Sequence, residues 1–289
     1  MDPVAARRAK RQRQAGQPAV LVGAIIGAVA QAVCAFVLGR GIGALVEVLR
    51  HTFTDSVFDE RVPYPTYWGP ATIGILLVVG GIGMVVAAGV TWSLVDRYRG
   101  GEKRPALLAP LGVSAVAAGV VVDSRSWIKP LEVGTKVDTA FHTDESWSVF
   151  GWIAYYADIW FPALLVVIAV LFVVFGIKHN RRLKQQIADR TRLLTEGRRV
   201  EGEITEVTIR TSQNDQGQRT IVGADIVVKF ADAHGTDRWV TRRSNDRSAM
   251  PGTGYAEVLF DPMRASEEDL IFVAFHRDPA PGDWIGTAG

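Results

Sequence analysis

The sequence contains few of the residues that carry out most protein chemistry. It has one cysteine and five histidines in 289 residues. A single cysteine cannot form an intrachain disulfide, and Cys34 lies in an apolar run, so we expect it to pack as a small hydrophobic side chain. The histidines are far apart and never show the His-Glu-x-x-His or His-x-His spacing of metal sites; they are His51, His142, His179, His234 and His276.

Catalytic motifs are also missing. There is no Gly-x-Ser-x-Gly nucleophile motif, and a cysteine nucleophile would have to be Cys34 inside a membrane segment. Gly80-Gly81-Ile82-Gly83 superficially resembles a phosphate-binding loop, but no strand precedes it and no Lys-Ser/Thr pair follows it. We expect helix packing there. The sequence therefore predicts no catalytic residues, no metal site and no cofactor, and the protein is not expected to be an enzyme.

Charge is absent from long stretches of the first 177 residues. Residues 19–38, 71–95 and 105–122 contain no charged side chain, and residues 156–177 contain only Asp158. Each stretch has about the 20 residues that a helix needs to cross a bilayer, so we predict four transmembrane helices within residues 19–177. The first stretch exceeds a signal-peptide core of roughly 7–15 residues, and no lipobox precedes Cys34, which favours an uncleaved helix.

Basic residues are concentrated in three segments. Lys and Arg number five in residues 1–18, four in the turn 96–104 and eight in residues 178–199, against three in each of the two longer loops. Because Lys and Arg mark cytoplasmic segments, this pattern predicts a multi-pass membrane protein with both termini in the cytoplasm. Residues 1–18 are expected to form a disordered basic tail.

The fourth predicted span continues into a basic helix over residues 178–197. We expect it to end at Glu196, with Gly197 as its C-terminal cap. The segment is predicted either to lie on anionic headgroups or to stand as a stalk. The residues expected to contact those headgroups are Lys178, Arg181, Arg182 and Lys184.

A few residues in or near the spans invite a functional interpretation. The GxxxG pairs Gly23/Gly27 and Gly39/Gly43 are typical of helix contact faces, although glycine is also common in membrane helices. Arg40 and Glu47 follow the first apolar run, where we expect them to extend to the interface rather than to line a pathway. Asp158 is expected to be a solvated interfacial residue beside an aromatic belt.

From Val200 the pattern changes to short β-branched strands separated by turns. Five strands are predicted within residues 198–275, which favours a small barrel or sandwich, followed by a flexible tail over 276–289. Residues 200–289 hold nine Lys/Arg and fifteen Asp/Glu, so binding to nucleic acid is not expected. Two polar clusters have structural explanations: a hairpin turn for Asp232, His234 and Asp237, and a solvated helical turn for Glu267, Glu268 and Asp269.

The strand residues also carry a family resemblance. Arg199-Val200-Glu201-Gly202-Glu203-Ile204, Ala224 to Phe230 with Asp232 and Gly235, Gly252-x-Gly254, and Val258-Leu259-Phe260-Asp261-Pro262 form the pattern. Residues 197–275 thereby resemble the bacterial membrane-tethered β-domain family known as domain of unknown function 3592. Ile204 and Phe260 stand where Val and Tyr are usual, and Lys229 interrupts the second strand. The resemblance implies a small β fold beside membrane helices and no particular activity.

Two functions from different classes remain. The first is a non-enzymatic scaffold whose cytoplasmic β domain binds an unknown protein partner or mediates assembly of a homo-oligomer. The second is an oligomeric channel or transport component with the β domain as a cytoplasmic vestibule. The absence of charge from the central part of every predicted span weakens the second, although a hydrophobic gate needs none.

Overall fold

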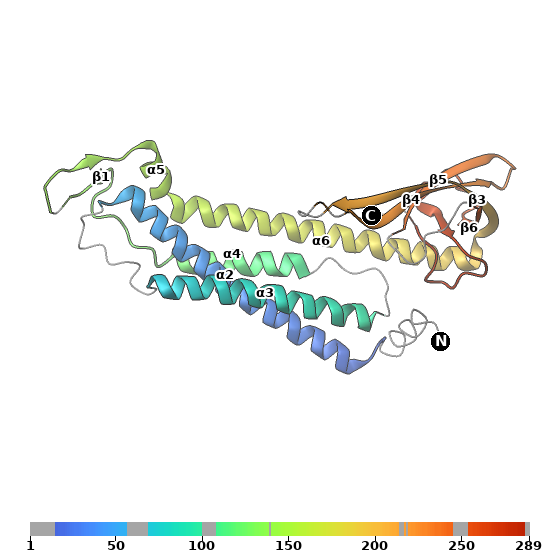
Figure 1. The fold of residues 1–289 in the computed structure, drawn as a ribbon, viewed down its shortest axis with the longest axis horizontal. Helices are drawn as coiled ribbons and strands as arrows, with labels where there is room; N and C mark the ends of the chain where they lie inside the picture. The colour runs from blue at the N-terminus through green and yellow to red at the C-terminus, as the bar shows by residue number, and fades with distance from the viewer. Residues whose placement is uncertain are drawn as a thin grey trace. The chain divides into compact units, whose positions relative to one another are not determined.

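A computed structural model of the chain describes residues 15–56, 69–99, 108–138, 140–213, 217, 219–244 and 254–286. The chain divides into two compact units, Met1–Lys178 and His179–Gly289, and each is considered by itself. Figure 1 labels most of the helices and strands of both units. Most of the predicted basic tail, residues 1–14, lies outside the described residues.

Helices make up most of the first unit. They are α2 (Pro18–Thr54), α3 (Pro70–Tyr98), α4 (Leu108–Ser124), α5 (Val149–Tyr155) and the first part of α6 (Ala157–Glu196). Two short strands, β1 (Thr135–Lys136) and β2 (Glu145–Ser146), pair antiparallel between α4 and α5. Helices α2, α3 and α6 are long and apolar enough to cross a membrane, and they include three of the four predicted spans. The span predicted at 105–122 is not confirmed, since α4 is a shorter apolar helix of 17 residues.

Helix α2 is longer than predicted. The sequence predicts a span over 19–38, whereas the helix runs for 37 residues and ends at Thr54. The additional turns contain Arg40 and Glu47, which bind partners on later segments instead of ending the helix. Both α2 and α3 begin with a proline in the first turn, where the missing N–H has no intrahelical partner to lose.

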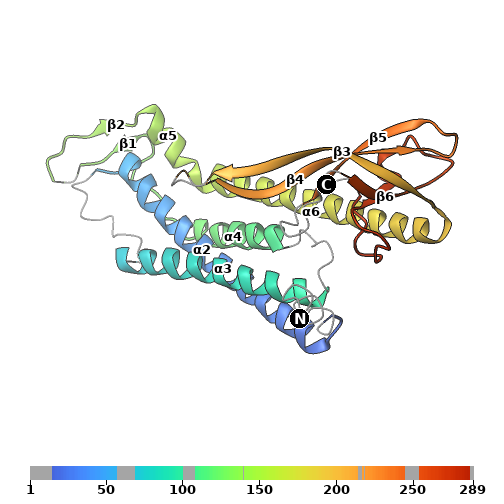
Figure 2. The ribbon, with the colours of Figure 1, turned by 45° about the vertical axis from the view of Figure 1, so that its right-hand side comes forward.

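Glycines bring α2 into contact with α3 and α4. A Cβ on Gly27 would lie 2.4 Å from Thr91 Oγ1 of α3, and a Cβ on Gly39 would lie 2.2 Å from Val116 O of α4. Such close approach confirms the predicted contact faces. Figures 1 and 2 show α2 crossing both helices obliquely. The two packing partners have opposite directions, because α3 runs antiparallel to α2 and α4 runs parallel to it.

Helix α6 is continuous from its apolar half into its basic half. It ends at Glu196, as predicted, and the N–H of Gly197 donates to Leu193 O at 2.8 Å. A Cβ on Gly197 would lie 2.5 Å from that same oxygen and 3.0 Å from Leu259 Cδ1. Glycine is therefore required at this position for close packing where the helix meets the first strand of the second unit.

The second unit contains the five predicted strands, joined in one sheet. They are β3 (Arg198–Gln213), β4 (Arg219–Ala231), β5 (Asp237–Ser244), β6 (Gly254–Phe260) and β7 (Ile271–Ala274), in the order β5-β4-β3-β6-β7. All neighbours are antiparallel. β3 is the central strand, and it is irregular between Ile204 and Glu206 and between Arg210 and Thr211.

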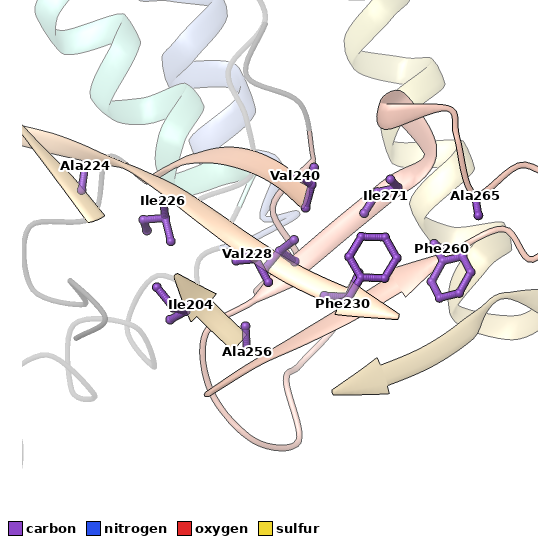
Figure 3. Close-up of a cluster of buried hydrophobic side chains, with 12 residues drawn as sticks. Ile204, Ala224, Ile226, Val228, Phe230, Val240, Ala256, Phe260, Ala265 and Ile271 are labelled. Atoms are coloured by element: carbon purple, nitrogen blue, oxygen red, sulfur yellow. The ribbon is translucent and has the colours of Figure 1, made fainter. Parts of the chain in front are cut away.

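Both faces of this sheet pack against apolar groups. Side chains from all five strands meet in one core, which includes the predicted alternating set Ala224, Ile226, Val228 and Phe230 of β4 (Figure 3). On the other face of β6 and β7, Leu193 of α6 packs with Leu259, Phe272 and Trp284. The end of α6 thus belongs to the hydrophobic core of the second unit.

The predicted barrel or sandwich is not seen. The sheet is open, and no pairing joins β5 to β7 within the ranges that the structure describes. Strand β7 instead forms a bridge with Ile285, and Trp284 is buried. Residues 276–286 therefore do not form the predicted flexible tail, because an apolar side chain near the end of the chain fixes them to the sheet.

Candidate functional site

Charged residues, most of them buried, gather along the C-terminal half of α2. We call Arg40, Glu47, Arg50, His51, Asp55 and Asp123 the polar cluster; Asp123 comes from α4 and the other five from α2 or the residue after it. Glu47, Arg50 and Asp123 are each less than 5% exposed. Buried charges are costly unless they are paired, so the contacts of this cluster determine what it can do.

An ion pair joins α2 to α4. Arg40 Nε donates to Asp123 Oδ1 at 3.0 Å, and Trp127 Nε1 donates to Asp123 Oδ2 at 3.3 Å. Gly43 leaves the space that this carboxylate occupies, since a Cβ there would lie 2.7 Å from Asp123 Oδ2. The carboxylate is therefore held from both helices, and its position depends on a glycine on α2.

Two further charges hold the main chain of a single residue after α4. Ile128 N donates to Glu47 Oε1 at 2.8 Å, and Arg50 Nη1 donates to Ile128 O at 2.9 Å. The prediction that Arg40 and Glu47 extend to the interface is wrong. Their charges are compensated within the helix bundle, which sequence patterns could not reveal because the partners lie about eighty positions later.

His51 completes the polar cluster. Its Nδ1 is in close contact with Asp55 Oδ2, and its Nε2 lies 3.9 Å from Glu47 Oε1. The cluster holds three carboxylates and two guanidinium groups, so its charges balance when His51 carries a proton. Lys136 of β1 also approaches this end of α2, with Nζ 3.5 Å from Thr52 O.

Aromatic side chains cover the same end of α2. Trp147 Nε1 donates to Thr54 O at 2.8 Å, and its ring packs edge-on against Trp152 at a centroid distance of 5.2 Å. The Arg50 guanidinium lies 5.9 Å from the centroid of the Tyr155 ring. Trp147 and Tyr155 thus fix the segment 140–156 to α2 by a hydrogen bond and a cation–π contact.

The other residues singled out in the membrane-seeking half have structural explanations. Cys34 is half-buried and lies against Gly83 of α3, consistent with a packing role. Gly80 lies against Leu38, so the glycine run forms a helix contact and not a phosphate loop. Asp158 is in the first turn of α6, where a carboxylate favourably faces the helix N-terminus.

In the second unit, Asp232 organises the turn between β4 and β5. Its Oδ1 accepts hydrogen bonds from the backbone N–H groups of His234 and Thr236, and Arg238 Nε donates to its Oδ2 at 2.8 Å. Arg238 and these N–H groups lower the pKa of the Asp232 carboxyl to about 2. Asp237 pairs with Lys229 at 2.7 Å. This confirms the predicted hairpin-turn chemistry.

The remaining predicted clusters are dispersed. Glu268 and Asp269 lie in a short 3₁₀ turn, Glu268–Leu270, directly before β7, as predicted. The histidines do not gather: His276 contacts Asp283 at 3.1 Å, and His51 belongs to the polar cluster. Within the part of the chain that the structure describes, no group of three or more His, Cys, Asp or Glu side chains is arranged to hold a metal ion.

Sequence reasoning missed Arg242. This β5 side chain is buried, and its guanidinium donates to Glu268 O and Ile271 O at 2.6 and 2.7 Å. Burial lowers the pKa of Arg242 to about 10. It links the two edge regions of the open sheet through hydrogen bonds to main-chain carbonyls. The available signal was its position: Val240, Arg242 and Ser244 alternate along the buried side of β5.

Chemically, the polar cluster pairs buried acidic and basic groups between α2, α4 and the segment after α4. Comparison with known proteins adds no assignment. No family model, no curated protein and no solved structure matches the chain. The resemblance of residues 197–275 to domain of unknown function 3592 therefore stays a prediction.

Proposed function

We propose that the chain is a multi-pass inner-membrane scaffold whose cytoplasmic sheet domain binds a protein partner or a second copy of the chain. The main support for this proposal is that one helix, α6, contains both an apolar half long enough to span a membrane and a side chain that belongs to the core of the sheet domain. Leu193 of α6 packs with Leu259 and Phe272 of the sheet. Such packing anchors the sheet domain to the end of a membrane helix.

Four spans with both termini in the cytoplasm suit the arrangement of the first unit. Gly16 N donates to Tyr98 O at 2.9 Å, so the start of α2 and the end of α3 lie together. Helix α4 runs parallel to α2, as a third span in an alternating series would. Its 17 described residues rise about 26 Å, near the roughly 30 Å of a hydrocarbon core.

The start of the basic half of α6 is proposed to bind anionic lipid headgroups. Lys178, Arg181, Arg182 and Lys184 directly follow the apolar run, and all four side chains are exposed. With 3.6 residues per turn, they project away from the face that carries Leu183 and Leu194. Leu183 is buried and Leu194 packs against the core of the sheet domain, so these cations are left available to headgroup phosphates.

Lipid binding can be tested by replacing the four cations with glutamine. Full-length protein in nanodiscs containing phosphatidylglycerol should retain less of that lipid in native mass spectrometry when Lys178, Arg181, Arg182 and Lys184 are all changed to Gln. A matched variant that replaces exposed Arg219 and Arg264 of the sheet domain should retain as much as the unchanged protein. Equal retention by all three proteins would contradict the proposal.

Trp239 is the proposed centre of the interaction surface on the sheet domain. Its indole is 56% exposed on β5, and Lys229 Nζ lies 5.5 Å from the centroid of its ring. Large exposed aromatics are enriched at protein interfaces. A photo-crosslinker in place of Trp239 in cells should give one recurring adduct, whereas one in place of exposed Met263 should give none. Failure to obtain a defined adduct at position 239 would contradict the proposal that Trp239 lies in an interaction surface.

A second function, an oligomeric channel or transporter, gains support from one observation. Helix α2 contains buried Glu47 and half-buried Arg40, and α4 contributes buried Asp123, so both helices extend beyond their predicted charge-free stretches and include ionisable groups. Ionisable groups inside membrane helices commonly mark ion or substrate pathways. Reproducible conductance of liposomes containing the protein, altered by Asp123→Asn, would favour this function over the scaffold. Silent liposomes would count against it.

A further inference from the structure

An apolar stripe on α2 faces away from the polar cluster. Leu45, Leu49 and Phe53 recur every four residues and are 41%, 51% and 43% exposed. Glu47 and Arg50, on the opposite side of the same turns, are buried. The Phe53 ring continues the stripe onto α5, because its centroid lies 6.4 Å from that of Phe150, which is also exposed.

The depth of this stripe follows from its attachment to α5. Besides the Phe53–Phe150 contact, Trp147 Nε1 donates to Thr54 O, which fixes the last turn of α2 to the segment just before α5. A single residue, Tyr156, separates α5 from α6. The apolar half of α6 begins there, so the end of α2 lies where α6 enters the membrane.

The remaining stripe residues then lie deeper than this entry point. Leu49 and Leu45 precede Phe53 by four and eight residues, which is about 6 and 12 Å along the helix axis. An upright α2 of 37 residues, about 55 Å long, would exceed the roughly 30 Å hydrocarbon core. A tilt near 40° shortens its span to about 42 Å, close to the bilayer with its headgroup regions. The oblique crossing of α2 over α3 and α4 fits such a tilt (Figure 2).

We propose that Leu45, Leu49, Phe53 and Phe150 form a lipid-facing surface, covered by acyl chains of the leaflet in which α6 begins. Lipid suits this stripe better than a second helix, because helix contacts in membranes rely on small residues and this stripe has only bulky ones. The glycines of α2 already contact α3 and α4. The polar cluster behind the stripe is consequently enclosed within the membrane and not in an aqueous loop region.

Spin labelling of the full chain tests the depth of the stripe. Cys34 is first changed to Ser, and single cysteines are then introduced as Leu45→Cys or Leu49→Cys. Val29→Cys, on an exposed part of the apolar run, and Glu145→Cys, on exposed β2, serve as membrane and aqueous references. Each nitroxide-labelled protein is placed in phosphatidylethanolamine/phosphatidylglycerol vesicles, and collision rates with oxygen and with a water-soluble nickel chelate are measured.

At both stripe positions, the ratio of oxygen to nickel collisions should exceed that at residue 145 several-fold and approach the ratio at residue 29. A ratio equal to that at residue 145 would overturn the proposal by placing the stripe in water. Spin–spin broadening that disappears on dilution with unlabelled protein would overturn it in another way, by showing a second copy on the stripe. Two label positions keep the test decisive if one substitution prevents folding.

Discussion

Arg242 offers the clearest test of how the open sheet is held together. Its guanidinium donates to the carbonyl oxygens of Glu268 and Ile271, and also to that of the adjacent Thr241, from a side chain that is 1% exposed. Hydrogen bonds from a charged donor contribute roughly 1.5–3 kcal/mol each, so the two bonds to Glu268 and Ile271 together contribute about 3–6 kcal/mol. Burial works against them: the fall in pKa from 12.5 to about 10 corresponds to about 3 kcal/mol against the charged form.

Two substitutions separate these effects. Arg242→Met removes both the hydrogen bonds and the buried charge, so the free energy of unfolding should fall by only about 2 kcal/mol. Arg242→Lys retains a buried charge that is more strongly hydrated than guanidinium and cannot present the same planar set of donors. Arg242→Lys should therefore lower the free energy of unfolding by more than Arg242→Met does, by about 3 kcal/mol or more. The charge-conserving change is expected to be the more harmful one.

Hydrogen-exchange mass spectrometry of the full chain in detergent can measure both changes. Amides of β5 and β7 should exchange about 30-fold faster in the Met variant, since each 1.4 kcal/mol corresponds to a factor of ten. The Lys variant should exchange faster still, and Arg264→Met, at an exposed arginine, should match the unchanged protein. Slower exchange in the Lys variant than in the Met variant would refute this account of Arg242.

Three other predictions concern both units. Gly119→Ala places a Cβ 2.3 Å from a carbonyl oxygen of α2 and should lower stability by about 1–3 kcal/mol, whereas Gly89→Ala, in open space, should not; equal thermal midpoints in detergent would contradict this. Because the pKa of Asp232 is depressed to about 2, its stabilising effect should be complete above about pH 4 and be lost as the pH falls towards 2. In Asp232→Asn, exchange of the β4–β5 turn amides should lose that pH dependence. Arg40→Gln and Asp123→Asn should each leave a partner charge uncompensated, so the double variant should lose less stability than the two single changes added together; additive losses would rule out the coupling.

Elements dictated by local pattern could be predicted closely. The end of α6 follows from an apolar and then basic helical segment stopped by Gly197, and the buried face of β4 follows from alternation between Ala224 and Phe230. Both depend on residues that are adjacent in the sequence. The contact role of the glycines on α2 was also readable, because GxxxG spacing places both members of a pair on one side of a helix.

Features that depend on distant partners could not be predicted. Glu47 lies within α2, where its carboxylate accepts a hydrogen bond from the N–H of Ile128, 81 positions later. Without knowledge of that partner, the charge of Glu47 indicated the end of a helix. The barrel prediction failed for a similar reason: five strands suggest closure, but β7 is only four residues long and its outer edge is bridged by Ile285. Arg242 then connects the edges with a side chain and not with strand pairing.

The ion pair between Arg40 and Asp123 also imposes an order on biosynthesis. Arg40 and Asp123 are 83 residues apart, and a ribosome adds roughly 5–20 residues per second, so Arg40 is made about 4–17 s before Asp123. Over that interval Arg40 lacks the Asp123 carboxylate, and insertion of a charged side chain at the centre of a membrane helix costs roughly 2.5–3.5 kcal/mol. The contact between α2 and α4 can therefore form only after Asp123 has been synthesised, so this part of the bundle is completed after α3 has been made.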